Sequence, residues 1–166
     1  MNINRKAKGF TIIEVVLVLA IAGLIFLMVF IALPALQRAQ RDTQRKNDLG
    51  RIATKIADYQ SNNRGVLPTS LILAVGTPAR TFVQRYLAGT ATVAGAEYLD
   101  PSSGTGYTFT GTTGVIANTG TIVYTPSVIC GVDGATTAAG ATNRTYALRT
   151  RLEGGTADAP YCVDNR

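Results

Sequence analysis

Hydrophobic residues form one long uninterrupted run near the start of the chain. Residues 15–33 contain no charged or strongly polar side chain. About 20 apolar residues in a helix span the ~30 Å hydrocarbon core of a membrane. A helix of a soluble domain does not ordinarily run this long without a polar face. We therefore predict a membrane-spanning helix over residues 10–36 rather than a buried helix of a soluble protein.

The pattern becomes amphipathic over residues 37–64. Apolar side chains recur there with the period of a helix, at Leu49, Ile52, Ala53, Ile56 and Tyr59. Asparagine, arginine and glycine at residues 62–65 indicate the end of the helix. We expect one helix from residue 10 to about residue 61, kinked at Pro34, whose outer half docks on a folded head.

The pattern over residues 65–166 is typical of short strands joined by turns. Strands are expected over residues 121–125, 128–130 and 144–152, a short helix from Thr77-Pro78 to Gly89, and a loop over residues 134–142. In the last strand, alternation places Tyr146 and Leu148 on one face and Arg149 and Arg151 on the other. These elements predict an α+β protein in which a small antiparallel β-sheet packs against the amphipathic half of the long helix.

The charge of the chain is unevenly distributed. The 166 residues carry a net charge of +6, which by itself suggests a nucleic acid or an anionic membrane as partner. Residues 65–166 are neutral, however, and the excess lies in residues 1–9 and 37–64. Basic residues beside an apolar segment orient it, here with residues 1–9 in the cytoplasm. The chain has no His, which excludes Ser-His-Asp and Cys-His catalysis, and no catalytic constellation is identified.

Glu14 is the one charged residue between residues 10 and 36. A carboxylate inside a membrane helix costs free energy, so such a residue usually has a partner, and none follows at helical spacing. The alternative is that the side chain snorkels to the lipid headgroups. An ordinary anchor does not explain Glu14. A cleaved secretory signal needs a site after the apolar run, whereas Ala20-Ile21-Ala22 lies inside it and Gln37-Arg38 is a poor site.

Residues 6–16, Lys-Ala-Lys-Gly-Phe-Thr-Ile-Ile-Glu-Val-Val, resemble the N-terminus of type IV pilins and pseudopilins. That family has a short basic leader ending in Gly, then Phe, then Glu four residues later, then an apolar helix. The resemblance implies that a prepilin peptidase removes residues 1–9 by cutting between Gly9 and Phe10, and that Phe10 is then N-methylated. It also implies that Glu14 interacts with the N-terminal amine of a neighbouring subunit during assembly.

The resemblance implies a structural subunit rather than an enzyme, without cofactor or metal. Such a subunit forms a homo-oligomeric helical filament, a pilus that serves adhesion, twitching motility or DNA uptake. Its precursor is a single-pass protein of the inner (cytoplasmic) membrane with a cytoplasmic N-terminus, and the mature form lies in an extracellular pilus. The expected partners are the prepilin peptidase, the assembly platform with its ATPase, related pilins, and the membrane before assembly.

Two other functions stay open. One is a pseudopilin of a type II secretion or competence system, which the turn at Asp100-Pro101 favours because it resembles a segment of major pseudopilins. The neutral head, rich in Thr and Gly, favours a pilin instead. The other is a membrane-anchored enzyme or binding module. The absence of His and of clustered carboxylates argues against an enzyme, and an anchor of that kind does not need Glu14.

Three groups of side chains between residues 37 and 166 are candidates for a disulfide, a metal site or a nucleic-acid surface. Cys130 and Cys162 are expected to form a disulfide in an extracytoplasmic head, with free buried cysteines as the alternative. The acids at residues 133, 158 and 164 fit no calcium loop and are expected to be solvated. The Lys and Arg residues of residues 37–64 are expected to form a solvated basic surface on the helix, here called the collar. The alternative is that they bind nucleic acid without sequence preference, which nothing else in the sequence supports. The collar consists of Arg38, Arg41, Arg45, Lys46, Arg51 and Lys55.

Overall fold

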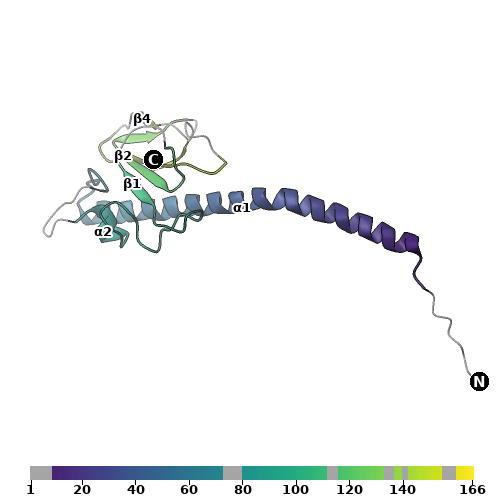
Figure 1. The fold of residues 1–166 in the computed structure, drawn as a ribbon. Coiled ribbons are helices and arrows are strands. Elements are labelled where there is room, and N and C mark those ends of the chain that lie inside the picture. The colour runs from purple at the N-terminus through teal and green to yellow at the C-terminus, as the bar shows by residue number, and fades with distance from the viewer. Residues whose placement is uncertain (1–8, 73–79, 112–115, 133–136, 140–141, 155–159) are drawn as a thin grey trace, which may run out of the picture. The chain divides into compact units, whose positions relative to one another are not determined.

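The fold is described by a computed structural model that covers residues 9–72, 80–111, 116–132, 137–139, 142–154 and 160–166. It forms two compact units, residues 1–37 and 38–166. Its elements, shown in Figure 1, are α1 (Ile12–Asn62), α2 (Phe82–Tyr86), β1 (Thr108–Thr110), β2 (Thr121–Pro126), β3 (Val128–Cys130), β4 (Thr137–Ala139), β5 (Tyr146–Thr150) and β6 (Tyr161–Asp164). The predicted long helix is confirmed, with bounds within two residues of those expected.

Four strands form the main sheet, in the order β1-β2-β5-β6. The pairs β2–β5 and β5–β6 are antiparallel, as predicted, whereas β1 and β2 are parallel. Parallel neighbours cannot be joined by a tight hairpin turn and need a longer connection, here the residues between Thr110 and Thr121. The α+β class is therefore confirmed, with one parallel pair in a sheet that is otherwise antiparallel.

A separate two-stranded sheet joins β3 and β4. The pairing is antiparallel and places Val128 opposite Ala139 and Cys130 opposite Thr137. The prediction of a loop over residues 134–142 was thus wrong for β4, because small Thr and Ala residues with little sequence pattern still pair when a neighbouring strand offers its backbone groups. The remaining residues of that segment, apart from Thr142, lie outside the described ranges.

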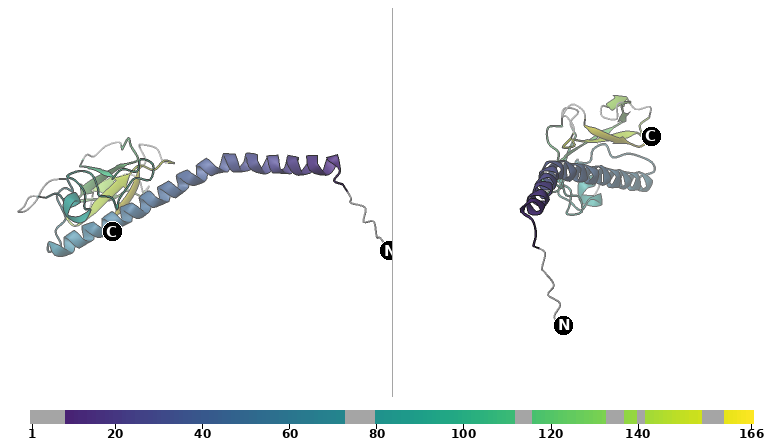
Figure 2. Two further views of the ribbon diagram at one scale, coloured as in Figure 1. Left: turned by 60° about the horizontal axis from the view of Figure 1, so that its bottom comes forward. Right: turned by 90° about the vertical axis from the view of Figure 1, so that its right-hand side faces the viewer.

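The main sheet packs with one face on the outer part of α1, within the unit of residues 38–166 (Figure 2). Leu49, Ile52 and Ile56 are at most 1 % exposed. They share one hydrophobic cluster with sheet residues Phe109, Ile122, Tyr124, Tyr146 and Leu148. The amphipathic stripe predicted for this half of the helix is therefore the face that meets the sheet.

The other face of the main sheet is covered near β3. Ala147, Cys130 and Cys162 form a second buried cluster there, with Val128 packed against it. All five residues of β5 are consequently buried. Arg149 lies on the face opposite to that of Tyr146 and Leu148, as the alternation predicts. It is nevertheless buried, because a sheet covered on both sides buries both sets of alternating residues.

The short helix α2 begins later than expected. Thr81 caps it, since its Oγ1 accepts a hydrogen bond from Gln84 N while Gln84 Oε1 accepts one from Thr81 N. This reciprocal capping box fixes the start at Phe82. Thr77 and Pro78, the predicted start, lie outside the described residues. The chain then turns at Gly89, where a Cβ atom would lie 2.0 Å from the carbonyl oxygen of Val93, so only glycine fits.

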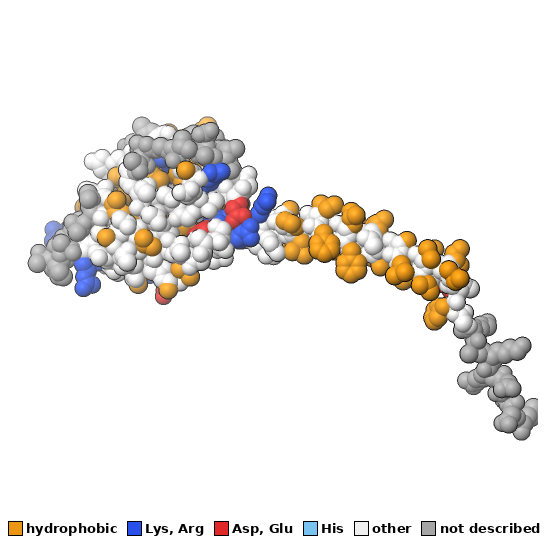
Figure 3. Space-filling model, viewed as in Figure 1, with side chains coloured by type: hydrophobic (Ala, Val, Ile, Leu, Met, Phe, Trp, Pro, Cys, Tyr) orange, Lys and Arg blue, Asp and Glu red, His pale blue; other side chains and the backbone are white. Residues whose placement is uncertain are grey.

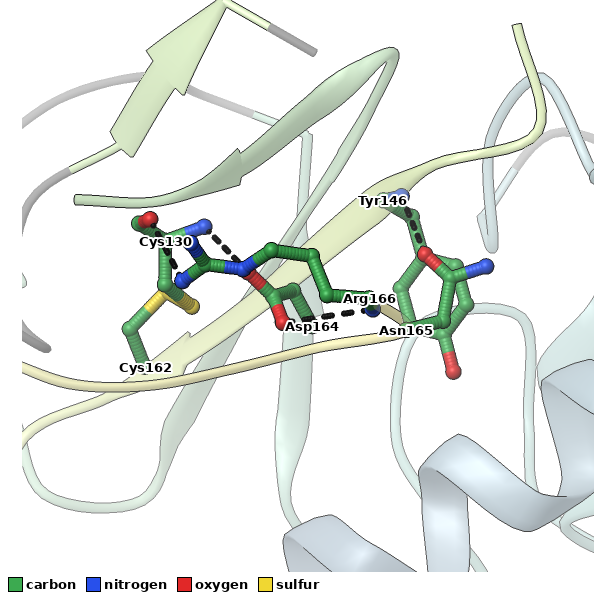
Figure 4. The surroundings of a disulfide bond; sticks show 6 residues. All are labelled: Cys130, Tyr146, Cys162, Asp164, Asn165 and Arg166. Atoms are coloured by element: carbon green, nitrogen blue, oxygen red, sulfur yellow. Dashed lines mark hydrogen bonds and ion pairs between the residues drawn. A yellow bond between two sulfur atoms is a disulfide. The ribbon is translucent and has the colours of Figure 1, made fainter. Parts of the chain in front are cut away.

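A disulfide joins Cys130 of β3 to Cys162 of β6, with the two Cα atoms 5.8 Å apart (Figure 4). The residues after β6 reinforce this link. Asp164 Oδ2 accepts a hydrogen bond from Cys130 N at 2.7 Å, and Arg166 Nη2 donates one to the Cys130 carbonyl at 3.0 Å. The end of the chain is thereby held to both sheets.

Removing this disulfide is expected to lower the free energy of unfolding by about 3–4 kcal/mol, because the bond closes a long loop and restricts the unfolded chain. The double substitution Cys130→Ala with Cys162→Ala should show this loss in thermal unfolding of the full chain in detergent. Wild-type protein under reducing conditions serves as the matched comparison. Equal unfolding temperatures for the oxidised, reduced and double-substituted proteins would show that the bond carries no stability.

Candidate functional site

The first site is the start of α1, within the unit of residues 1–37. Gly9, Phe10 and Thr11 precede the helix and are not helical, and Phe10 is 88 % exposed. The peptide bond predicted to be cut, Gly9–Phe10, thus lies in an accessible segment outside the helix. Along residues 12–36 the large apolar side chains of the helix are exposed, and Figure 3 shows them covering the face of the helix that it draws. It is long and apolar enough to cross a membrane, which fits a membrane-anchored precursor.

Glu14 has a local partner that sequence reasoning did not identify. Its Oε2 accepts hydrogen bonds from Thr11 N at 3.0 Å and from Thr11 Oγ1 at 2.8 Å. Glu14 N in turn donates to Thr11 Oγ1 at 3.4 Å. This is a capping box, and its signature Thr-x-x-Glu stands in the sequence at residues 11–14. Thr11 therefore sets where α1 begins, two residues after the predicted cleavage point.

These hydrogen bonds do not neutralise Glu14. Thr11 contributes a hydroxyl and an amide, neither of which carries a charge, so the carboxylate keeps its need for a cation when it enters an apolar environment. Within the unit of residues 1–37, the described part offers no Lys or Arg close to it. Pro34 lies inside α1, and the kink expected there stays a prediction.

The second site is a buried charge network that joins α1 to the head, within the unit of residues 38–166. Arg45 has no exposed side-chain surface. Its Nε donates to Asp100 Oδ1 at 2.7 Å, its Nη1 to Asp42 Oδ1 at 2.8 Å, and its Nη2 to Ser102 Oγ at 2.9 Å. Nη2 also lies 3.0 Å from Glu153 Oε1. One guanidinium thus connects three segments that are far apart in the sequence.

The carboxylates of this network are themselves held in place. Arg41 forms a two-point hydrogen bond to Glu153, at 2.7 and 2.6 Å. Asp42 accepts from the backbone N–H groups of Glu153 and Gly154, at 2.8 and 3.1 Å. Paired, two-point geometry of this kind gives orientation as well as energy. The network therefore fixes how the segment after β5 docks on the helix.

The charges of the network shift the pKa values of its members. Burial alone would raise the pKa of Asp100, but hydrogen bonds from Arg45 and Ser102 outweigh it and hold that pKa below its usual range. The hydrogen bond from Arg41, with help from Arg45, holds the pKa of Glu153 low despite some burial. Both carboxyls are therefore ionised at neutral pH, and Arg45 stays protonated.

A neighbouring carboxyl behaves differently. Burial raises the pKa of Asp48, although a hydrogen bond from Tyr107 Oη at 3.1 Å and the guanidinium of Arg51 at 3.4 Å oppose the rise. Arg51 also lies over the ring of Tyr98, 4.6 Å from its centroid, and Lys46 Nζ lies 5.1 Å from the centroid of the Tyr161 ring. Aromatic side chains of the head thus face this part of the helix.

The prediction of a solvated basic collar was therefore wrong for Arg45 and, in part, for Arg41. Arg45 is buried and fully paired, and Arg41 is half-buried and bound to Glu153. Lys46 and Arg51 contact aromatic rings of the head but stay exposed. Arg38 is exposed, and Lys55 is half-buried with its Nζ 3.8 Å from Asp58 Oδ2. Four of the six bases, Arg41, Arg45, Arg51 and Lys55, lie within ion-pair distance of carboxylates of the chain. Little uncompensated positive charge is therefore left for phosphate groups, and the collar gives no support to nucleic-acid binding.

The structure brings no metal ligands together. Among the described residues, no group of three or more His, Cys, Asp or Glu side chains is placed so that it could hold a metal ion. Asp164 is paired with Arg166 at 2.9 Å rather than solvated, and the acids at 133 and 158 lie outside the described ranges. The two cysteines are joined to each other.

Comparison with known families identifies the N-terminal segment. Residues 4–30 match the prokaryotic N-terminal methylation motif. This is the prepilin-type signal of type IV pilins and pseudopilins, and in this chain it contains Gly9, Phe10 and Glu14. Searches of curated proteins and of solved structures found no match to the chain. The family signal thus covers the start of α1 and not the head.

Replacing Arg45 by Met should lower the free energy of unfolding by about 3–5 kcal/mol, because it leaves three carboxylates without their shared cation. Arg38→Met is the matched control, since Arg38 lies on the same helix but is exposed, and it should change stability by less than about 0.5 kcal/mol. Thermal and denaturant unfolding of both variants measures the difference. Equal effects of the two substitutions would contradict the role of Arg45.

The same comparison has a pH signature. The pKa values of Asp100 and Glu153 are lower in the folded chain than in the unfolded chain, so the folded state binds fewer protons and their contribution is present at neutral pH. It is lost as the pH falls from about 4 through the lowered folded values. The stability difference between wild type and Arg45→Met should therefore shrink on acidification. A difference that stays constant to pH 2 would contradict the network.

Removing the Thr11 cap should loosen the first turn of α1. In Thr11→Val, amide hydrogen exchange over residues 12–15 is expected to be about five-fold faster than in wild type, because a hydroxyl cap is lost. Thr11→Ser keeps the hydroxyl and should exchange like wild type. Hydrogen-exchange mass spectrometry of the full chain in detergent measures both, and identical exchange in Val and Ser variants would rule out the cap.

Proposed function

We propose that this chain is the precursor of a type IV pilus subunit, which polymerises through its N-terminal helix into an extracellular filament. A prepilin peptidase cuts between Gly9 and Phe10, and the new amine of Phe10 is methylated. The observation that carries the proposal is the methylation motif at residues 4–30, placed on an apolar helix that begins just after an accessible Gly9–Phe10 bond.

The position of Glu14 explains why cleavage and assembly belong together. After cleavage Glu14 is the fifth residue of the mature chain and Phe10 carries a free amino group. A carboxylate in a dry bundle of helices needs a cation, and the amine of a neighbouring copy supplies one at the matching depth. A subunit inserted out of register leaves both charges unpaired, so the pair selects the correct register.

In the precursor, the Thr11 cap holds Glu14 until that partner arrives. Its two hydrogen bonds reduce the number of unsatisfied oxygens on the carboxylate without adding an ion pair. The carboxylate still lacks a cation, and the N-terminal amine of an incoming subunit supplies it. Residues 10–36 first anchor the precursor, with residues 1–9 in the cytoplasm, and then pack against the same residues of other copies.

A pseudopilin of a secretion or competence system is the second candidate. The segment that favours it, the turn at Asp100, has a structural role, because Asp100 binds Arg45 and Ser102. This role is needed in either kind of filament. The neutral head, with its many Thr and Gly residues, supports a surface-exposed pilin. We therefore place the pilus first.

Expression in a host with a prepilin peptidase tests the proposal. Mass spectrometry of the mature chain should show a methylated Phe10 as first residue. Glu14→Gln keeps the size of the side chain and its hydrogen-bonding ability but removes the charge. It should be inserted in the membrane like wild type, yet give sheared filaments reduced at least ten-fold, judged by electron microscopy.

Asp58→Asn is the matched control, because Asp58 is an exposed acid in the outer part of α1, and it should leave the filament yield unchanged. A mature chain that keeps residues 1–9, or that starts after residue 37, would refute the proposal. Normal filaments from Glu14→Gln would refute the charge pair. Trace amounts of the chain in the wild-type filament would favour a minor pilin or a pseudopilin.

A further inference from the structure

The face of the main sheet that points away from α1 contains an unusual arginine. Arg149 lies on β5, opposite Val123 of β2 and Cys162 of β6. Thr125 lies on the same face, because it is two residues beyond Val123 and pairs with Ala147. Diagonal neighbours on one face of an antiparallel pair are about 7–8 Å apart, within reach of a long side chain.

Each of the two side chains holds one buried polar atom without a hydrogen-bond partner, although Thr125 as a whole is only half-buried. Arg149 is 8 % exposed and Thr125 Oγ1 is buried. Arg149 Nε and Thr125 Oγ1 are the two buried side-chain polar atoms without a hydrogen-bond partner in the part of the chain that the structure describes. A buried guanidinium N–H without an acceptor is costly, since Arg cannot give up its proton. Two such atoms at diagonal positions indicate a shared missing partner.

The described acids do not supply this partner. Asp164 is the candidate that the register suggests, because it lies on the same face of β6, opposite Ala147. Its Oδ2 is already bound by Cys130 N at 2.7 Å and by Arg166 Nε at 2.9 Å, as Figure 4 shows. The acids Asp42, Asp100 and Glu153 are committed to Arg45 and Arg41.

We propose that Arg149 and Thr125 form a binding site for a carboxylate or similar oxyanion on the face of the head opposite α1. Both groups are donors: the guanidinium offers Nε–H, and the hydroxyl of Thr125 donates one hydrogen bond. A planar oxyanion matches the fork of a guanidinium and pairs with its charge. The ligand is either a small free anion or a carboxylate carried by another protein chain. Both present the same chemistry to the site.

The test uses the full chain in a non-ionic detergent, with perchlorate as the reference anion. Sodium acetate and sodium phosphate are titrated at constant ionic strength, and the unfolding temperature and the NMR signal of Arg149 Nε–H are followed. The matched variant is Arg149→Met, which keeps the length of the side chain and removes the charge. The NMR signal reports on the wild-type protein even if the variant folds poorly.

A saturable rise of the unfolding temperature with acetate or phosphate, together with a shift of the Nε–H signal and loss of both in Arg149→Met, supports the site with a small anion as ligand. If small anions have no effect but the signal shifts as the concentration of the chain is raised, a carboxylate of a second copy is the ligand. No response in either series overturns the proposal, as does an equal response in the variant.

Stability without added ligand gives an independent criterion. An unpaired buried charge destabilises the fold, so Arg149→Met should be at least as stable as wild type in perchlorate buffer. A fall of the unfolding temperature by about 10 °C or more would mean that Arg149 is paired inside the chain, and the site would then be ruled out.

Discussion

Arg45 carries a full charge where its side chain is closed to water, and the unit of residues 38–166 depends on how that charge is compensated. Asp42, Asp100 and Glu153 together provide the compensation. Each comes from a different segment: the helix, the turn before β1, and the chain after β5. Because a buried ion pair costs several kcal/mol when one partner is removed, the three segments adopt the native arrangement together. The hydrophobic stripe of α1 stabilises the contact between the helix and the sheet. The charges around Arg45 determine which of the possible positions of the three segments is adopted.

The same constraint, applied to the membrane half, links structure to function. Glu14 has hydrogen bonds from Thr11 but no cation. In the precursor this carboxylate lies close to the end of the apolar segment, and in the proposed filament it would be surrounded by helices. The free amine created by cleavage at Gly9–Phe10 is a cation of the required kind. A peptidase that exposes this amine would therefore convert an anchored precursor into an assembly-competent subunit without any other change in the helix.

The sequence predicted the features that depend on local patterns. The long helix, its apolar and amphipathic halves, and the strands at β2, β3 and β5 follow from periodicity alone. The Arg45 network could not be predicted, because Asp100 and Glu153 are separated from Arg45 by more than fifty residues and nothing in a single sequence pairs them. The spacing of Asp42 and Arg45 was visible, yet an exposed pair has the same spacing. The Thr11–Glu14 capping box could have been found, since its pattern is complete within four residues. The parallel β1–β2 pair and the burial of Arg149 depend on how layers stack, which alternation does not encode.

The most direct measurement of the central claim is a cryo-electron microscopy map of filaments assembled from the mature chain, at a resolution that shows side chains. The account predicts that the helices of residues 10–36 form the filament core, and that the Glu14 carboxylate lies within about 4 Å of the Phe10 nitrogen of a neighbouring copy, the distance of an ion pair. A filament in which Glu14 contacts only Thr11 of its own chain, or in which these helices lie outside the core, would contradict it.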